Sequence, residues 1–482
     1  YRELRHLVNK TACALVARGY QKGERIGLWS ENSLFFVIAY LGTIRAGLVV
    51  VPVPKELTLP ALSEISSQAE LLALFAHRRR CSSALEDWAE RSGVALLKEG
   101  QWPEQLPERE LPMPTIDPVR DLAALMFTSG STGTPKGVMV SHRNIESNSR
   151  DIVGYIGLNQ RDRAMVVLPL HYCFGTSLLH THLLAGGSVV LNNDFRLYPE
   201  AVLQEMRERE CTGLAGVPST YQILLRKSRF AHLSFPRLRW FQQAGGRLPS
   251  PCIAEMINAF PQVKFYIMYG QTEATARLSF LPPERLRDKL GSIGRGLPST
   301  TLVVRKPGGT PVTPGSTDVG EILARGDNIT LGYWRDPVET AKFYRDGWLS
   351  TGDLARVDAD GFIFIVERER DIIKSGGNRV SAKEVEDTIA ELREVLEVAV
   401  IGIPHEFLGD ALQAFVVPHK AGSLSPREVQ AYCRQRLPSF KVPERVGFLE
   451  VMPHNDAGKV LKLKLRDLAA GEKEGSSRLE RI

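Results

Sequence analysis

Apolar residues near the start of the chain first recur with the period of a helix and then gather in short runs. The first set is spaced close to 3.6 residues apart and predicts a helix, with Gly19 placed to end it. Its members are Leu4, Leu7, Val8, Ala12, Leu15 and Val16. A strand is expected at 25–29, a buried helix at 33–46 and a β-branched strand at 48–53. Helices that alternate with apolar strands indicate α/β layers with much parallel sheet.

The middle of the chain continues this pattern and then changes. Residues 99–118 carry five prolines and several glutamates, which predicts a surface connection. Ser141 is placed to cap a helix after the next strand pair, and a further α/β section is expected to about residue 280. From 291 to 366 the chain becomes glycine-rich and strand-like, which indicates a smaller β subdomain.

Beyond residue 370 the pattern predicts a small separate α/β domain. Ser381 with Glu384, and Ser425 with Glu428, have the spacing of helix capping boxes. Strands are expected at 396–403, 411–417 and 445–451, and a disordered tail at the end. The predicted organisation is an N-terminal domain, a C-terminal domain and a tail, at 1–368, 369–470 and 471–482.

Composition narrows the class of protein. With 482 residues, 43% hydrophobic and 24% charged, the chain is long enough for more than one globular domain. A net charge of +6 without a concentrated basic run disfavours nucleic acid as the main partner. The six cysteines form no C-x-x-C pair, so we expect a reducing, cytoplasmic setting. The apolar run at 33–44 is shorter than the ~20 residues that span a bilayer. Because the chain begins at Tyr1 rather than Met, we expect a missing segment upstream.

The stretch TSGSTGTPKG (128–137) lies between two expected strands and predicts a phosphate-binding loop. Glycines allow close backbone approach, while N–H groups, hydroxyls and a lysine can hold phosphate oxygens. An exposed hairpin loop uses the same small residues, and it is the alternative. The candidate ligands are Thr128, Ser129, Gly130, Ser131, Thr132, Gly133 and Lys136. Pro135 before the lysine departs from the G-x-x-x-x-G-K-[ST] pattern and disfavours a kinase-like NTPase.

Other polar clusters also interrupt apolar segments. Thr272 and Glu273 follow a strand-like run, and a carboxylate beside phosphates suits Mg²⁺. Asp353 follows a glycine, where a carboxylate could accept from both ribose hydroxyls. Segment 366–379 mixes charges with two glycines, and Lys459 lies in an Asp-Ala-Gly turn. Taken singly, Glu273 could equally belong to a solvated loop, and 366–379 could also be an exposed linker. An Asp after Gly is more often a turn residue, and a lone Lys in a turn is usually just solvated.

Together these motifs resemble the adenylate-forming superfamily, which includes acyl-CoA synthetases, aryl-CoA ligases, adenylation domains and beetle luciferases. The resemblance rests on the order of six motifs and covers almost the whole chain. They are TSGSTGTPKG, YGQTE, GYW, STGD, ERERDIIKSGG and NDAGK. It implies a large N-terminal domain of three subdomains and a small C-terminal domain that reorients.

The resemblance also assigns roles to residues. The loop at 128–136 would hold the β- and γ-phosphates of ATP, Thr272 the α-phosphate and Glu273 the Mg²⁺. Asp353 would bind the ribose with Arg368, and Lys459 would bridge the acid's carboxylate and the α-phosphate. The adenine would lie against Gly245, Gly246, Arg247 and Tyr269. The segment with Lys374, Gly376 and Gly377 would approach the thiol of CoA or of a carrier-protein phosphopantetheine.

The expected function is ATP-dependent activation of a carboxylic acid to an acyl adenylate, followed by transfer to CoA. The stretch LPLHYCFGTSLL (168–179) contains no acidic residue to pair with an α-ammonium, which favours a fatty or aryl acid. His171 matches the position that lies near the carboxylate in such ligases, although a packed core histidine is the alternative. Loading of a carrier protein, a luciferase-like oxidoreductase and a non-catalytic nucleotide-binding relative are the rival functions.

Overall fold

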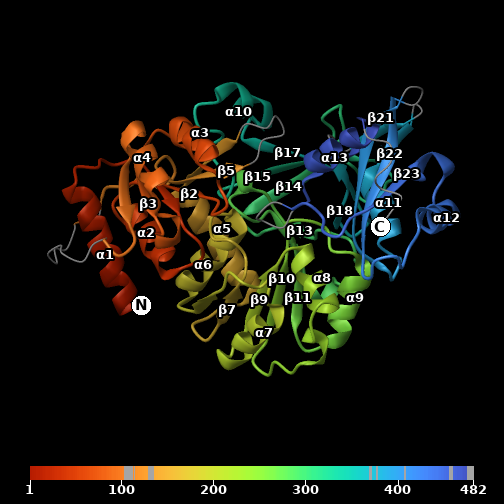
Figure 1. Cartoon of the computed structure of the whole chain (residues 1–482), viewed down its shortest axis with the longest axis horizontal. Coiled ribbons are helices and arrows are strands. Elements are labelled where there is room, and N and C mark those ends of the chain that lie inside the picture. The colour runs from red at the N-terminus through yellow and green to blue at the C-terminus, as the bar shows by residue number, and fades with distance from the viewer. Residues whose placement is uncertain are drawn as a thin grey trace.

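The strands form four sheets within the residues that the structure describes, and helices lie against these sheets (Figure 1). The structure is a computed structural model of the whole chain. It describes residues 1–101, 112, 114–128, 135–368, 372–375, 378–405, 409–454 and 460–474.

The first sheet has the order β4-β3-β1-β2-β5-β6 and is parallel except for the last pair, β5 and β6. Its strands are β1 (Arg25–Trp29), β2 (Val49–Val53), β3 (Leu71–Ala76), β4 (Ala95–Lys98), β5 (Leu122–Thr128) and β6 (Lys136–Ser141). Its helices are α1 (Arg2–Ala17), α2 (Leu34–Arg45), α3 (Leu59–Ala69) and α4 (Ser83–Ser92). The predicted first helix, strand, second helix and β-branched strand are confirmed, and Gly19 has a φ of +87° just past α1.

The second sheet has the order β13-β12-β11-β10-β9-β7-β8, with a parallel centre and an antiparallel edge at β12 and β13. Its strands are β7 (Arg163–Val166), β8 (Ser188–Leu191), β9 (Gly213–Gly216), β10 (Trp240–Gln243), β11 (Lys264–Tyr269), β12 (Ser279–Leu281) and β13 (Arg295–Gly296). Its helices are α5 (His142–Ile156), α6 (Cys173–Ala185), α7 (Pro199–Glu208), α8 (Pro218–Arg226) and α9 (Ser250–Ala259). Ser141 caps α5 in a full capping box with Asn144, as its position predicts.

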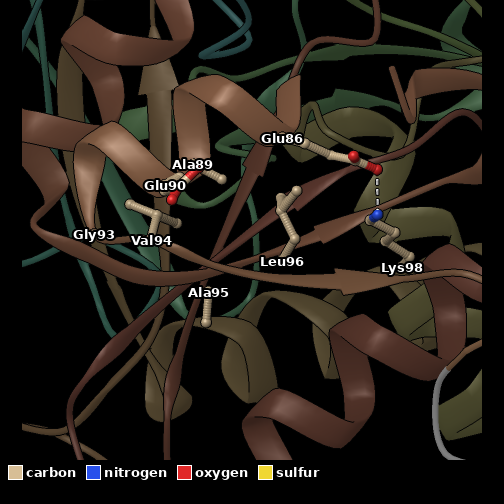
Figure 2. Close-up of a pocket in the computed structure, with 8 residues that line it drawn as sticks. All are labelled: Glu86, Ala89, Glu90, Gly93, Val94, Ala95, Leu96 and Lys98. Atoms are coloured by element: carbon tan, nitrogen blue, oxygen red, sulfur yellow. Dashed lines mark hydrogen bonds and ion pairs between the residues drawn. The ribbon is translucent and has the colours of Figure 1, made fainter. Parts of the chain in front are cut away.

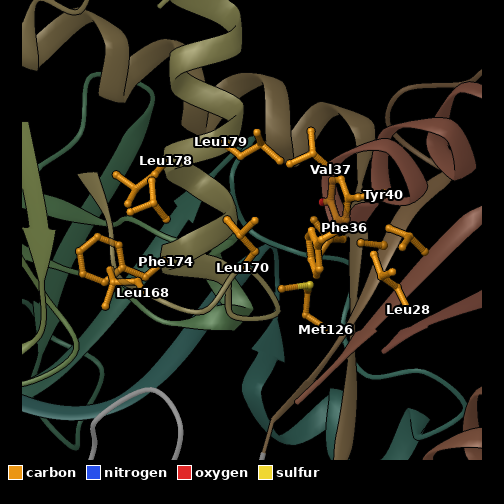
Figure 3. Packing of buried hydrophobic residues seen from close by; sticks show 14 of the residues in the cluster. Leu28, Phe36, Val37, Tyr40, Met126, Leu168, Leu170, Phe174, Leu178 and Leu179 are labelled. Carbon is orange, nitrogen blue, oxygen red and sulfur yellow. The ribbon is translucent and has the colours of Figure 1, made fainter. Parts of the chain in front are cut away.

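A shared apolar core joins the first two sheets. It takes in α2 from one layer and α6 from the other, and Figure 3 shows Val37 beside Leu179 across this boundary. Phe36 and Met126 lie in the same cluster. Because the two layers bury one continuous core, the ends of their strands are held in fixed positions relative to each other.

An antiparallel third sheet follows, as the strand-like pattern of residues 291–366 predicts. Its strands are β14 (Thr300–Arg305), β15 (Gly320–Gly326), β16 (Tyr344–Arg345), β17 (Trp348–Val357) and β18 (Ile363–Arg368), with helix α10 (Pro337–Phe343) beside them. β17 carries the STGD motif and lies between β15 and β18.

The C-terminal part forms its own sheet, β20-β19-β22-β21, with β23 paired to β22. Its elements are β19 (Ile372–Ser375), β20 (Asn378–Ser381), α11 (Ala382–Ile389), β21 (Val395–His405), β22 (Gly409–Pro418), α12 (Pro426–Arg436), β23 (Arg445–Phe448) and α13 (Lys462–Glu474). The capping box of Ser425 and Glu428 is confirmed, whereas Ser381 accepts from the Glu384 N–H without the reciprocal bond.

Several boundaries in this part differ from the sequence prediction, and β21 and β22 each extend beyond the expected 396–403 and 411–417 at both ends. β23 ends at Phe448 rather than at 451. α13 continues to Glu474, so residues 471–474 are helical where a disordered tail was expected. Helix formation here follows from anchoring, since Leu465 and Ala469 are buried against β21 and β22. The expected domain boundary at 368/369 adjoins residues outside the described ranges and stays a prediction.

The apolar run at 33–44 forms the buried helix α2, as predicted. In the described part of the chain, no helix is both long and apolar enough to cross a bilayer.

Candidate functional site

The predicted phosphate loop connects the two strands of an antiparallel hairpin. Thr128, the last residue of β5, is paired in register with Lys136, the first residue of β6. Residues Ser129, Gly130, Ser131, Thr132 and Gly133 lie outside the described residues. The hairpin therefore fixes the two ends of the loop, and the role of the loop itself stays a prediction.

Lys136 is held by partners from the GYW region. Its ammonium forms an ion pair with Glu339 of α10 and lies 5.6 Å from the centre of the Tyr333 ring. Lys136 lowers the pKa of Glu339 through this hydrogen bond, with a further contribution from Lys342. The segment that carries Tyr333 runs along β6, where the Met139 N–H donates to Gly332 O at 2.9 Å. Sequence reasoning gave Lys136 as a candidate but missed Glu339.

Glu273 lies in the same cluster. The Tyr333 hydroxyl donates to Glu273 Oε1 at 2.8 Å, and burial together with this carboxylate raises the pKa of Tyr333. The Glu273 carbonyl accepts from both the N–H and the hydroxyl of Thr330, at 3.0 and 2.9 Å. A cation, a phenol and a carboxylate therefore meet near the start of β6 and just beyond the end of β11. They belong to Lys136, Tyr333 and Glu273.

The turn that follows Glu273 is strained. Thr275 has a φ of +66°, which is unusual for a β-branched residue. Its hydroxyl donates to Asn328 O at 2.7 Å, and this bond helps to hold the conformation. Such strain is characteristic of turns that position functional side chains.

The expected adenine and ribose residues are also close together. Tyr269 ends β11, and its hydroxyl donates to Asp353 Oδ2 at 2.6 Å. Asp353 is 1% exposed and comes from β17. Gly245 adopts a φ of +83°, and a Cβ there would lie 2.9 Å from Val217, so this loop packs closely on the segment after β9. Gly245 and Gly246 are both exposed, and Gly246 lies beside Pro218.

Several expected residues can be placed only in part. Arg368 pairs with Asp353 in the register of β17 and β18, and Lys374 lies in β19. Gly376, Gly377 and Lys459 lie outside the described residues. The Lys459 segment is flanked by an antiparallel bridge between residues 454 and 460. Their functional roles stay predictions.

Contacts between the C-terminal part and the nucleotide-side loops were not foreseen from the sequence. Arg247, after the two glycines, forms an ion pair with Asp387 of α11. Lys383 of the same helix donates to Ile365 O in β18 at 3.2 Å. Burial, together with the charge of Arg247, lowers the pKa of Lys383 to about 8. Helix α11 therefore lies against the loops expected to bind the base and ribose.

His171 is buried and lines a small cavity. The cavity has a volume of about 40 Å³, and Lys55 and Asn193 also line it. Burial, with a smaller effect of Lys55, lowers the pKa of His171 to about 3, and its Nε2 atom has no hydrogen-bond partner. Two residues after His171, Cys173 Sγ lies 3.5 Å from Thr272 Oγ1.

A second hollow lies at the β4 edge of the first sheet. It is an open depression between α4 and β4, and Figure 2 shows the Glu86–Lys98 ion pair at one side. The candidate site residues are not among those that line it.

The motifs imply a Mg²⁺ ion, which the residues near the phosphate hairpin would have to bind. No group of three or more His, Cys, Asp or Glu side chains arranged to hold a metal ion is found among the described residues. Two carboxylates lie near the phosphate hairpin: Glu273 accepts from the Tyr333 hydroxyl, and Glu339 pairs with Lys136. This donor set fits Mg²⁺, which is commonly bound by one or two carboxylates together with substrate phosphates.

Two protein-family models and several curated relatives match the sequence of this chain. The model of the AMP-binding enzyme family matches residues 1–334, and that of the AMP-binding enzyme C-terminal domain matches residues 384–459. A long-chain-fatty-acid–CoA ligase of Yersinia pestis is 33% identical, over 93% of this chain and 86% of the relative. A feruloyl-CoA synthase of Amycolatopsis sp. is 32% identical, over 97% and 93%.

A solved structure shows the same fold. The o-succinylbenzoate CoA synthetase of Bacillus subtilis in complex with its acyl-adenylate intermediate matches with a TM-score of 0.86 and 26% identity, over 97% of this chain and 93% of that one. The same synthetase has also been solved with ATP and a magnesium ion. The chain therefore belongs to the AMP-binding enzyme family, as the motif order predicts, and it is an AMP-forming ligase.

Proposed function

We propose that this chain couples a carboxylic acid to a thiol in two steps that share one site. In the first, a carboxylate oxygen attacks the α-phosphorus of ATP, the α–β phosphoanhydride bond breaks, and pyrophosphate leaves. In the second, a thiolate attacks the acyl carbon, the bond to AMP breaks, and a thioester forms. CoA is the proposed thiol donor, because the relatives named above are CoA ligases.

The observation that supports this function most strongly is the convergence of three groups from separate segments. Asp353 with Tyr269 forms a buried acceptor suited to ribose hydroxyls, 2.6 Å apart. Thr272 and Glu273 follow the same strand β11, and Lys136 approaches them through Tyr333. Strand β11 thus connects the proposed ribose acceptor with the proposed phosphate residues, which supports binding of one nucleotide across them.

Charge explains why these groups suit the first step. The acid and ATP are both anionic, so the reaction depends on positioning and on neutralising charge. Lys136 and Lys459 are the proposed cationic residues for the phosphates and the carboxylate. Bound Mg²⁺ would add positive charge at the phosphates, and Glu273 would hold it there, while Thr272 would bind the α-phosphate.

His171 does not act as a proton donor in this proposal. With a pKa of about 3 the imidazole is neutral at physiological pH. It can therefore take part only through packing or a neutral hydrogen bond. Cys173, the first residue of α6, contacts Thr272, the residue proposed to bind the α-phosphate.

The test is ATP–pyrophosphate exchange over fatty, aryl and amino acids, followed by thioester detection with CoA or a carrier-protein phosphopantetheine. We expect exchange with a fatty or aryl acid and thioester formation with CoA. Preference for an amino acid would contradict the proposed acid class. Thioester formation on the carrier alone would contradict CoA as the acceptor.

A further inference from the structure

A fully buried arginine lies just behind the Thr272–Glu273 turn. Arg277 precedes β12 and is 1% exposed. Its backbone is fixed by two buried amides. Asn148 accepts from the Arg277 N–H at 3.2 Å, and both Asn148 and Asn328 donate to the Arg277 carbonyl at 2.8 Å. These bonds involve only the main chain, so they set where the side chain begins but do not explain why it is an arginine.

Among the residues that the structure describes, the guanidinium of Arg277 has no carboxylate partner. Its carbon lies 4.0 Å from the centre of the Phe174 ring, and Nε donates to Met268 Sδ, a weak acceptor, at 3.2 Å. Nη2 is buried without a hydrogen-bond partner. Tyr155, partly through a side-chain hydrogen bond, and Cys173 favour its charged form, and neither is a carboxylate. Burial lowers the pKa of Arg277, yet an arginine in a protein stays protonated.

Such an arrangement is unfavourable for the fold alone. A buried charge without a counter-ion destabilises a protein, and an apolar side chain of similar size is commonly more stable there. The ring and the thioether compensate only part of this cost. An arginine at this position is therefore better explained by a partner that comes from outside the chain.

The position of the guanidinium indicates which molecule would bring that partner. Phe174 and Cys173 are neighbours at the start of α6, and Cys173 contacts the Thr272 hydroxyl at 3.5 Å. Contacts through Phe174 and its neighbour Cys173 thus connect Arg277 to the residue proposed to bind the α-phosphate. Figure 3 shows Phe174 beside Leu168 and Leu178 at the edge of the shared core. The acid must place its carboxylate next to Thr272, and the rest of the acid can then extend towards α6.

We propose that Arg277 binds a second carboxylate on the acid, separate from the carboxyl group that is activated. This inference rests on the proposed function and adds the substrate class. The Phe174 ring lies against the guanidinium, and Nη2, which has no partner, is left to donate in the guanidinium plane to a carboxylate, the group that arginine binds best. Because Nη2 is buried, Phe174 or Cys173 must turn when the acid enters.

The experiment compares matched acids in ATP–pyrophosphate exchange. Each pair consists of a straight-chain monocarboxylic acid and the α,ω-dicarboxylic acid of equal length, across several lengths. For the best length we expect kcat/KM of the wild type to favour the dicarboxylic acid, and Arg277→Met to reduce this preference about 10- to 100-fold, mainly through KM, since hydrogen bonds to charged groups have this strength. Arg277→Lys should retain part of the preference.

A matched control removes a neighbouring polar group without removing the charge. Tyr155→Phe deletes the hydroxyl that hydrogen-bonds the guanidinium but keeps the charge, so it should change the ratio between the two acids much less than Arg277→Met does. Thermal unfolding of Arg277→Met should show a melting temperature equal to or above that of the wild type, because an unpaired buried charge is removed.

The outcomes separate this inference from the proposed function. Exchange with no acid at all would contradict the proposed function. Exchange that favours the monocarboxylic acid at every length in the wild type would overturn the inference alone, whether or not the variant folds. An unchanged ratio in a folded Arg277→Met variant would show that the arginine is structural, and it would also overturn the inference.

Discussion

The hydrogen bond between Tyr269 and Asp353 gives the most direct structural prediction about nucleotide binding. Its oxygens are 2.6 Å apart, Asp353 is 1% exposed, and Tyr269 is 8% exposed. A hydrogen bond to a charged group contributes about 1.5–3 kcal/mol. Tyr269→Phe keeps the ring and removes the donor, so we expect the free energy of unfolding to fall by an amount in that range.

The same substitution should change how the ribose is recognised. If Asp353 accepts from the ribose hydroxyls, loss of the Tyr269 donor leaves its carboxylate less well oriented. We expect KM for ATP to rise by about tenfold, the equivalent of roughly 1.4 kcal/mol. The preference for ATP over 2′-deoxyATP should shrink in the same variant. 2′-DeoxyATP lacks one of the two hydroxyls that Asp353 would bind, so it loses less than ATP does when the carboxylate is poorly oriented.

The assay measures kcat/KM for both nucleotides by pyrophosphate exchange, and the unfolding free energy by urea denaturation. Tyr266→Phe is the matched control, since it lies on the same strand and its hydroxyl makes only a 3.4 Å contact with the Tyr155 carbonyl. A Tyr269→Phe variant with unchanged stability and an unchanged ATP/2′-deoxyATP ratio would refute the reasoning.

Three further predictions concern the lysine of the C-terminal turn, the ion pair to α11 and the buried histidine. Lys459→Ala should abolish pyrophosphate exchange but spare most thioester formation from a supplied acyl adenylate; equal loss in both assays would contradict its role. Arg247→Ala and Asp387→Ala should show a coupling free energy below about 1 kcal/mol in a double-mutant cycle of unfolding, because both side chains are about one-third exposed; a coupling several times larger would show that the pair is not screened. His171 has a folded-state pKa of about 3 against 6.5 for an ordinary histidine, so protonation favours the unfolded state and the unfolding free energy should fall as pH drops below about 6.5. His171→Gln should flatten that fall in urea denaturation between pH 7 and 5, and an identical slope would contradict burial of a neutral imidazole.

Much of the fold could be predicted because its signals are local. The periodicity of α1, the apolar run of β2 and the capping residues Ser141 and Ser425 each depend on a few adjacent residues. The end of α13 could not be predicted in this way. Its last turns are polar in sequence, and the helix is anchored by contacts that Leu465 makes with strands far away in the chain.

The site was predicted as a set of motifs but not as a set of contacts. The order of the motifs indicated that Glu273 and Asp353 belong together, and their strands bring them to one region. The side chains that complete the cluster come from distant segments, such as Tyr333, which is 60 residues from Glu273. Arg277 looked like any residue of a polar turn, and only packing shows that its charge is buried.

The central claim is that this chain makes an acyl adenylate from ATP, and the most direct measurement follows the nucleotide products. The protein is incubated with ATP, Mg²⁺, CoA and a panel of acids, and the products are separated by chromatography. We predict AMP, pyrophosphate and an acyl-CoA in equal amounts, dependent on one class of acid. Formation of ADP and phosphate, or of no acid-dependent product by a folded protein that binds ATP, would contradict the account.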